Sequence, residues 1–258
     1  MGIAETDFAH WAHLSPPIDW SGIYSICDLG QQELFTGAPG AMRSALAALA
    51  GPLGVPDADI DKLMAERWIR DIWKAFGRRI TSIDVVGSGE DYLYLDLNSD
   101  TVPPEHRGRY DFVTNCGTTE HVMNQYNCFQ IMHELARPGG YMYHSLPCSG
   151  LTNHGFFSYR PKFFSLLALA NGYQFVDAFV TADPTLRPLD DESRAMMRQE
   201  KAFLSATIYG SAEHLVRDFQ STDAGIRVCL RKPLGDEPFK PPLDVRAENV
   251  DVYGGSTG

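Results

Sequence analysis

The sequence predicts a three-layer α/β domain built on a seven-stranded, mainly parallel β-sheet. Short apolar runs rich in β-branched and aromatic residues alternate with segments whose apolar residues recur every three or four positions. The clearest case covers residues 110–146, where a strand, a helix and a second strand follow one another with short connections. Such units form right-handed crossovers in parallel sheets. A chain of 258 residues is long enough to bury the core of a three-layer domain.

The first third of the chain supplies a flanking segment, one strand and an insertion. Residues 1–22 contain two tryptophans and a Pro-Pro break, and we expect a helix and loop that cap the domain. The first strand covers residues 23–30, is apolar on both faces and ends in glycine. Residues 36–61 form a Gly/Pro/Ala-rich insertion with a helix predicted at 41–50. Because the insertion follows the first strand so closely, it is a candidate lid.

Two strands that end in carboxylates follow. An amphipathic helix is predicted to open at Asp61 and to close at Gly77, with an inward face formed by Leu63, Trp68, Ile72 and Phe76. The strands predicted at 80–84 and 92–96 each end in an aspartate. Ligands of doubly wound folds bind at the carboxyl ends of the strands, where a carboxylate can accept hydrogen bonds from ribose hydroxyls.

The strand–helix–strand unit contains the fourth and fifth strands, at 110–115 and 141–146. Its helix is predicted to begin at Thr118–His121, and its apolar face is formed by Val122, Tyr126, Phe129, Met132 and Ala136. Proline and two glycines at 138–140 predict a turn into the fifth strand. Strands six and seven are predicted at 173–179 and 226–231, and residues 233–258 as a loosely held polar tail.

Composition narrows the class of protein. A formal net charge of -11 argues against a nucleic-acid partner, which would meet a basic face. The five cysteines are scattered without a CxxC pair, which favours a reducing, cytoplasmic setting over a disulfide framework or a zinc knuckle. No apolar run approaches the roughly 20 residues of a membrane span, so no membrane partner is expected.

The order of these features resembles the class I S-adenosylmethionine-dependent methyltransferases, which have a Rossmann-like fold, over about residues 23–232. Asp28-Leu29-Gly30 is similar to the first motif of that family, and residues 110–122 and 135–140 are similar to its fourth and fifth motifs. Each motif alone is weak, and their order carries the resemblance. It implies transfer of a methyl group from S-adenosylmethionine to a small molecule, as in the bacterial subgroup that residues 154–157 resemble.

The resemblance also implies which residues bind the cofactor. Asp84 stands at the position of the ribose-binding acid, and Asp96-Leu97 stands at the position of the adenine-contacting residues. The full predicted set is Asp28, Gly30, Gln32, Asp84, Asp96, Leu97 and Asn115.

The chain departs from the family pattern in two ways. Gln32 and Leu34 occupy positions where the family has glycines, and 54 positions (84 − 30) separate Gly30 from Asp84 instead of about 20. Two alternatives therefore stay open. One is a non-methylating enzyme that uses the same cofactor, such as a cyclase or lyase, and the other is a catalytically silent nucleotide-binding or partner module. A nicotinamide dehydrogenase is disfavoured by the single glycine.

Three histidines are candidates for removing a proton from the acceptor. His121 follows the fourth strand, His144 lies within the fifth, and His154 lies in the loop after it. Histidine suits this role near neutral pH. Helix capping, core packing and substrate contact are the competing roles. The three histidines show neither HxH nor HExxH spacing, so no metal site is predicted.

Overall fold

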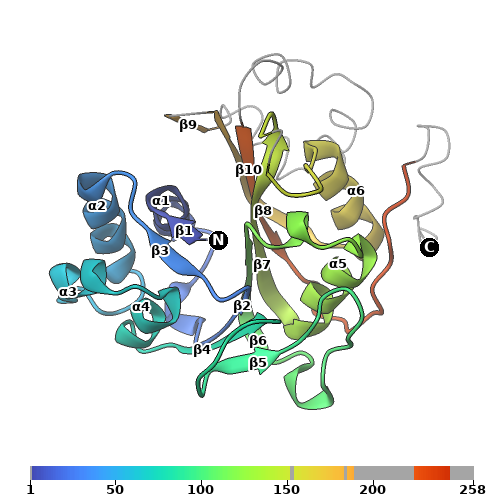
Figure 1. Ribbon diagram of the computed structural model, residues 1–258, viewed down its shortest axis with the longest axis horizontal. Helices are drawn as coiled ribbons and strands as arrows, with labels where there is room; N and C mark the ends of the chain where they lie inside the picture. The colour runs from blue at the N-terminus through green and yellow to red at the C-terminus, as the bar shows by residue number, and fades with distance from the viewer. Residues whose placement is uncertain (1, 152–153, 183–184, 189–223, 245–258) are drawn as a thin grey trace.

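The computed structural model describes residues 2–151, 154–182, 185–188 and 224–244. Its main sheet has eight strands (Figure 1), in the order β5 (Tyr92–Tyr94), β4 (Arg79–Asp84), β2 (Ser25–Leu29), β6 (Tyr110–Cys116), β7 (Ala136–Ser149), β10 (Ala224–Arg231), β8 (Gln174–Ala182) and β9 (Thr185–Pro188). The five strands from β5 to β7 are parallel, and β10 runs antiparallel to both of its neighbours. All seven predicted strands lie in this sheet, and the predicted α/β class is confirmed. The short strand β9 extends one edge.

Helices cover both faces of the sheet (Figure 1). One layer contains α1 (Glu5–His13), α2 (Pro39–Ala50), α3 (Ile60–Ala65) and α4 (Ile69–Ala75), and the other contains α5 (Gln125–Leu135) and α6 (Pro161–Asn171). Successive side chains of a strand point to opposite faces of the sheet and therefore pack into different cores. Phe112 packs with the first layer, whereas Val113 packs with the second. The result is the predicted three-layer sandwich.

The amino-terminal segment and the insertion are built into the first helical layer. Helix α1 buries Phe8 and Trp11 completely, and α2 buries Met42 and Leu46 in the same core cluster. Strand β1 (Gly2–Ala4) pairs in parallel with β3 (Glu33–Phe35) to form a second, two-stranded sheet. The segment 36–61 thus belongs to the connection from β2 to β4. Its role as a lid stays a prediction.

The helix predicted between Asp61 and Gly77 is wrong in detail, because α3 and α4 are separate. Glu66 and Trp68, between the two helices, have extended backbone. The amide of Leu34 donates to the carbonyl of Arg67 at 2.8 Å, and Trp68 forms an isolated bridge with Glu33. These bonds draw the chain alongside β3 and break the helix. Trp68, predicted to face inward, is only half-buried.

The unit at 110–146 also differs from the prediction. Thr119–His121 form a short 3-10 helix, η3, and α5 starts later, where the side chain of Asn124 accepts from the amide of Asn127 at 3.2 Å. The turn predicted at 137–140 is instead the irregular beginning of β7, with a register shift against β6. The single helix predicted from Thr118 is therefore wrong, and η3 is a separate element next to the tip of β6.

The described part of the carboxy-terminal tail is tied to the second helical layer. The carbonyl of Glu237 lies 2.8 Å from Nε2 of His133. Asn171 on α6 donates to the carbonyl of Lys240 and accepts from its amide, both at 2.8 Å. The prediction of a loosely held tail is wrong for residues 233–244, and residues 245–258 lie outside the described part. No helix in the described ranges combines the length and apolar character that a membrane crossing requires.

Candidate active site

The carboxyl tips of β5, β4, β2 and β6 lie next to one another, because these strands are consecutive in the sheet. Gly30 directly follows β2 in a left-handed conformation (φ +83°), and its amide donates to the carbonyl of Ile83 on β4 at 2.6 Å. The chain then enters β3, and the next helix begins only at Pro39. The site therefore lacks the helix amino terminus that follows the glycine loop in dinucleotide-binding folds.

Asp84 lies at the tip of β4 and faces the loop after β2. One carboxylate oxygen accepts from the amide of Gln31 at 2.9 Å, and the other accepts from the amide of Val86 at 3.1 Å. A carboxylate has about four acceptor positions, so two remain. Asp84 is half-buried. It can therefore accept further hydrogen bonds from a hydroxyl-bearing ligand.

Asp28 and Gln32 are buried next to the tip of β2, and each keeps an unused acceptor atom. The hydroxyl of Thr114 donates to Oδ1 of Asp28, while Oδ2 is buried and has no hydrogen-bond partner among the described residues. Burial raises the pKa of Asp28 to about 7, although the bond from Thr114 lowers it in part. Gln32 donates to the carbonyl of Leu29 at 2.9 Å and to Thr118 Oγ1 at 3.1 Å, and its Oε1 likewise has no partner there.

Asn115 lies at the end of β6 and is completely buried. It donates to Thr119 Oγ1 at 2.8 Å and accepts from the amide of Thr119 at 3.2 Å. Tyr159 donates to the same Thr119 hydroxyl at 3.0 Å and is hydrogen-bonded to Gln125. Asn115 therefore joins β6, η3 and the loop after β7. Thr118, which the sequence analysis did not single out as a site residue, links η3 to β2 by donating to the carbonyl of Leu29 at 2.6 Å.

Two of the three candidate histidines come together around Glu120. The rings of His121 and His154 lie 5.0 Å apart between centroids, and His154 Nε2 lies 3.3 Å from Glu120 Oε1. The side chain of Glu120 is 1% exposed and that of His154 is 48% exposed. Burial raises the pKa of Glu120. Its Oε2 has no hydrogen-bond partner in the described part of the chain. The sequence predicted that Glu120 lies in the first turn of a helix. Its burial could not be predicted, because it depends on a loop 34 positions further along the chain.

His144 is separated from this pair. Its ring packs against Phe129 and Phe164, with centroid distances of 5.6 Å and 5.0 Å. Nδ1 lies 3.3 Å from the side-chain nitrogen Nδ2 of Asn115. Burial lowers the pKa of His144 to about 3, which keeps the imidazole neutral at physiological pH. This position favours core packing, and a catalytic role for His144 stays a prediction.

Asp96 and Leu97, predicted to contact adenine, take part in local structure. The carboxylate of Asp96 accepts from the amide of Asn98 at 2.8 Å and closes its own turn. The side chain of Leu97 is 6% exposed and belongs to the second core. Their predicted contact with the cofactor is untested.

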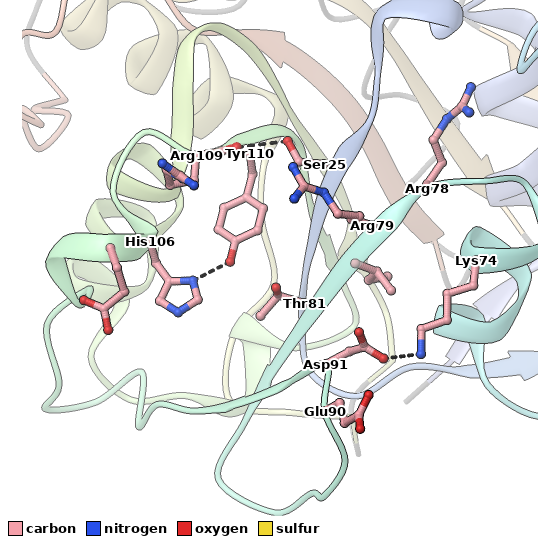
Figure 2. Close-up of a pocket in the computed structure, with 12 residues that line it drawn as sticks. Ser25, Lys74, Arg78, Arg79, Thr81, Glu90, Asp91, His106, Arg109 and Tyr110 are labelled. Atoms are coloured by element: carbon pink, nitrogen blue, oxygen red, sulfur yellow. Dashed lines mark hydrogen bonds and ion pairs between the residues drawn. The ribbon is translucent and has the colours of Figure 1, made fainter.

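A polar pocket of about 360 Å³ lies at the opposite edge of the sheet, where β2, β4 and β6 begin (Figure 2). Two of its cations, Lys74 and Arg78, already have partners within the protein. Lys74 is paired with Asp91, and Arg78 donates to the carbonyls of Phe76, Trp20 and Leu53. Figure 2 also shows His106 facing the hydroxyl of Tyr110. The carboxyl edge, with its unused acceptors, is the better candidate for a ligand site.

Comparison with known proteins finds likenesses to methyltransferases. No family model matches the chain. The ubiquinone biosynthesis O-methyltransferase of Shewanella pealeana is 30% identical over 66 residues, and the match covers 26% of this chain and only 28% of that enzyme.

Two solved structures cover more of the chain at lower identity. A putative sarcosine dimethylglycine methyltransferase from Galdieria sulphuraria has 13% identity and a TM-score of 0.48, with 89% of this chain and 85% of that one covered. The 1,6-didemethyltoxoflavin N1-methyltransferase of Burkholderia thailandensis, solved with S-adenosylhomocysteine, has 14% identity, a TM-score of 0.43 and coverage of 88% and 80%. At these values the functional argument rests on the geometry of the site itself.

Proposed function

We propose that this chain is an S-adenosylmethionine-dependent methyltransferase that acts on a small molecule. One observation carries the proposal. At the adjoining tips of β2, β4 and β6, the buried side chains of Asp28, Gln32 and Glu120 each keep an acceptor atom without a partner among the described residues. Nearby, Asp84 keeps spare acceptor capacity. Buried polar atoms are normally hydrogen-bonded, so this edge of the sheet calls for a ligand rich in donors.

The donor set fits the proposed cofactor. S-adenosylmethionine has a positively charged ammonium group, a positively charged sulfonium centre and two ribose hydroxyls. Asp84 would accept from the ribose hydroxyls, while Gln32 Oε1 and Asp28 Oδ2 would face the cationic methionine part. A nearby cation would also favour the ionised form of Asp28, whose pKa of about 7 leaves it poised between two states.

When bound, the cofactor supplies an activated methyl group on a good leaving group. The chain then has to hold the acceptor in line and exclude water. The hydrogen bonds of Asn115, Thr119 and Tyr159 hold η3 against the loop after β7. The histidines His121 and His154, with Glu120, form the part of this site at which an acceptor can be activated.

Gln32 supports a second candidate function, that of a non-methylating enzyme. Its side chain is 2% exposed and fills a position where the family has glycine. A cofactor displaced by this side chain would suit a non-methylating enzyme such as a cyclase or lyase. A catalytically silent module would be the outcome if binding were also lost.

Calorimetry with S-adenosylmethionine and S-adenosylhomocysteine tests the proposal. We expect both to bind, and NAD, as a control nucleotide, not to bind. Absence of binding by both would overturn the enzyme proposals together. Binding without formation of S-adenosylhomocysteine, over a panel of phenols, amines and thiols, would favour the non-methylating candidate.

We also propose a reducing, cytoplasmic setting and an acceptor other than nucleic acid. All five cysteines are free and buried. The net charge of -11 disfavours a phosphate backbone as partner. A role in small-molecule biosynthesis follows from the class of acceptor.

A further inference from the structure

We propose that Glu120, His121 and His154 form a binding site for one divalent transition-metal ion of the zinc class. Each residue offers one ligand atom, and these atoms all lie within 4.8 Å of one another. Two imidazoles and one carboxylate are a common ligand set for zinc and for related ions.

The cluster is preorganised by the backbone. The amides of Phe156 and Phe157 both donate to the carbonyl of Glu120, at 2.7 Å and 3.2 Å. Gly155 has a left-handed conformation (φ +65°), and a Cβ atom at this position would lie 2.9 Å from Cγ of Glu120. Only glycine allows so close an approach. The loop that contains His154 is therefore seated directly on Glu120.

A metal ion explains these contacts better than a hydrogen-bonded histidine–carboxylate pair does. Charge-assisted hydrogen bonds are usually about 2.7–2.9 Å long. The distance of 3.3 Å between His154 and Glu120 is longer than that. The second oxygen of Glu120 is buried and has no partner among the described residues, and His121 offers a third ligand atom within 4.8 Å of the others. A cation placed among the three side chains would compensate the buried carboxylate.

The required movement is small. A metal ion held at about 2.0–2.2 Å from each ligand brings the ligand atoms to roughly 3–3.5 Å from one another. Rotation of the two exposed imidazoles can close the remaining distance, while Glu120 stays fixed in the core. Because both histidines reach the surface, coordination positions stay open to a substrate, as in catalytic zinc sites.

The proposed site narrows the class of acceptor. A metal-bound hydroxyl loses its proton to water more easily than a free one, so the site fits an acceptor with a hydroxyl oxygen. The proton passes to bulk water, and no oxidant or reductant is needed. This role in activation rests on the proposed methyl transfer, whereas the metal site does not.

The test measures metal binding without the cofactor. The full chain is stripped with a chelator, loaded with Zn²⁺, freed of excess metal and analysed by mass spectrometry, with affinities from competition against a chromophoric chelator. We expect one Zn²⁺ per chain. His121→Ala, His154→Ala and Glu120→Gln should each weaken binding by more than about 100-fold, beyond the loss typical of outer-shell partners. His13→Gln, which alters an exposed histidine on α1, should leave the affinity unchanged.

Three results would overturn parts of the proposal. Failure to take up Zn²⁺ removes the site. Unchanged affinity in Glu120→Gln shows adventitious binding by surface histidines and also removes it. Uptake of Zn²⁺ by a chain that does not bind S-adenosylmethionine keeps the site and overturns only its role in acceptor activation. Visible absorption of the Co²⁺-loaded protein, lost in His121→Ala, would support the ligand set independently of activity.

Discussion

Two buried carboxylates in this molecule, Asp7 and Asp28, are satisfied to very different degrees. Asp7 lies in the first turn of α1 and accepts from the amide of Ala4 at 3.0 Å, the hydroxyl of Tyr143 at 3.2 Å and Nε of Arg227 at 2.7 Å. Asp28 lies near the tip of β2, and its only hydrogen bond within the described residues comes from Thr114. No cation is paired with Asp28 there.

Because their partners differ, we assign Asp7 a structural role and Asp28 a place in the proposed ligand site. A buried charge is tolerated when it is paired and hydrogen-bonded, as Asp7 is. An unpaired buried acid raises its pKa instead and costs stability when it is ionised. Glu120 resembles Asp28 in this respect, and both lie at the edge of the sheet where we place the ligand site.

The largest effect on stability is expected from breaking the ion pair between Asp7 and Arg227. Arg227→Met should lower the free energy of unfolding by about 3–5 kcal/mol, because it leaves Asp7 buried without its counter-ion. Urea denaturation at pH 7 measures the loss. The double variant Asp7→Leu/Arg227→Met should recover much of it, since no charge then stays buried. A loss below about 1 kcal/mol in the single variant would mean that Asp7 does not depend on Arg227.

A smaller effect, with a pH signature, is expected at Asp28. The pKa of this acid is raised by burial from an ordinary value near 4 to about 7. Between about pH 4 and pH 7, Asp28 has lost its proton in the unfolded chain but keeps it in the folded chain. The Asp28 carboxyl therefore contributes stability at low pH, and this contribution is lost as the pH rises through about 7. Between pH 5 and pH 8, the ligand-free wild type should lose about 2–3 kcal/mol relative to Asp28→Asn. Urea denaturation of both proteins at the two pH values measures this difference. An equal difference at both pH values would contradict the assigned pKa.

Asp84 and Asp96 also differ in their hydrogen bonds, and we expect them to differ in their contribution to cofactor binding. Both carboxylates accept from an amide two residues on. Asp84 also accepts from the amide of Gln31 in the loop after β2, whereas Asp96 accepts from the side chains of Asn98 and Ser99 in its own turn. Asp84→Ala should weaken binding of S-adenosylmethionine by about 1–3 kcal/mol, the cost of lost charged hydrogen bonds. Asp96→Asn should bind nearly as well as the wild type. Calorimetry on variants with unchanged circular dichroism separates these cases, and equal losses would restore the predicted role of Asp96.

The sequence was sufficient for the parts of the fold that local pattern encodes. Apolar runs marked the seven strands, and a carboxylate at the end of a strand placed Asp84 at the correct edge of the sheet. The pairing of short strands that are far apart in the sequence has no such local signal. Strands β1 and β3 contain three residues each, and the bonds that β3 makes with Arg67 and Trp68 break the helix predicted from Asp61.

The candidate site was only partly predictable for the same reason. His121, His144 and His154 were equivalent on spacing, yet the structure buries His144 between two aromatic rings and joins the other two around Glu120. Glu120 and His154 are 34 positions apart, and their contact depends on the close approach of Gly155. Hydroxyls and a carboxylate directly after a buried strand were a usable signal. We read that signal as a helix cap, whereas the segment is a buried 3-10 turn.

The smallest effect on stability is expected at His121, although this residue is central to the proposed metal site. Its side chain is exposed, and surface substitutions away from caps and networks usually change stability by less than about 0.5 kcal/mol. His121→Ala should therefore unfold in urea almost as the wild type does, while it loses Zn²⁺. Arg227→Met should show the opposite pattern, with a large loss of stability and retained Zn²⁺ affinity in the folded fraction. If His121→Ala instead lost more than about 1 kcal/mol, the residue would belong with Asp7 among the groups that hold the fold together. Its loss of metal could then no longer be assigned to a missing ligand.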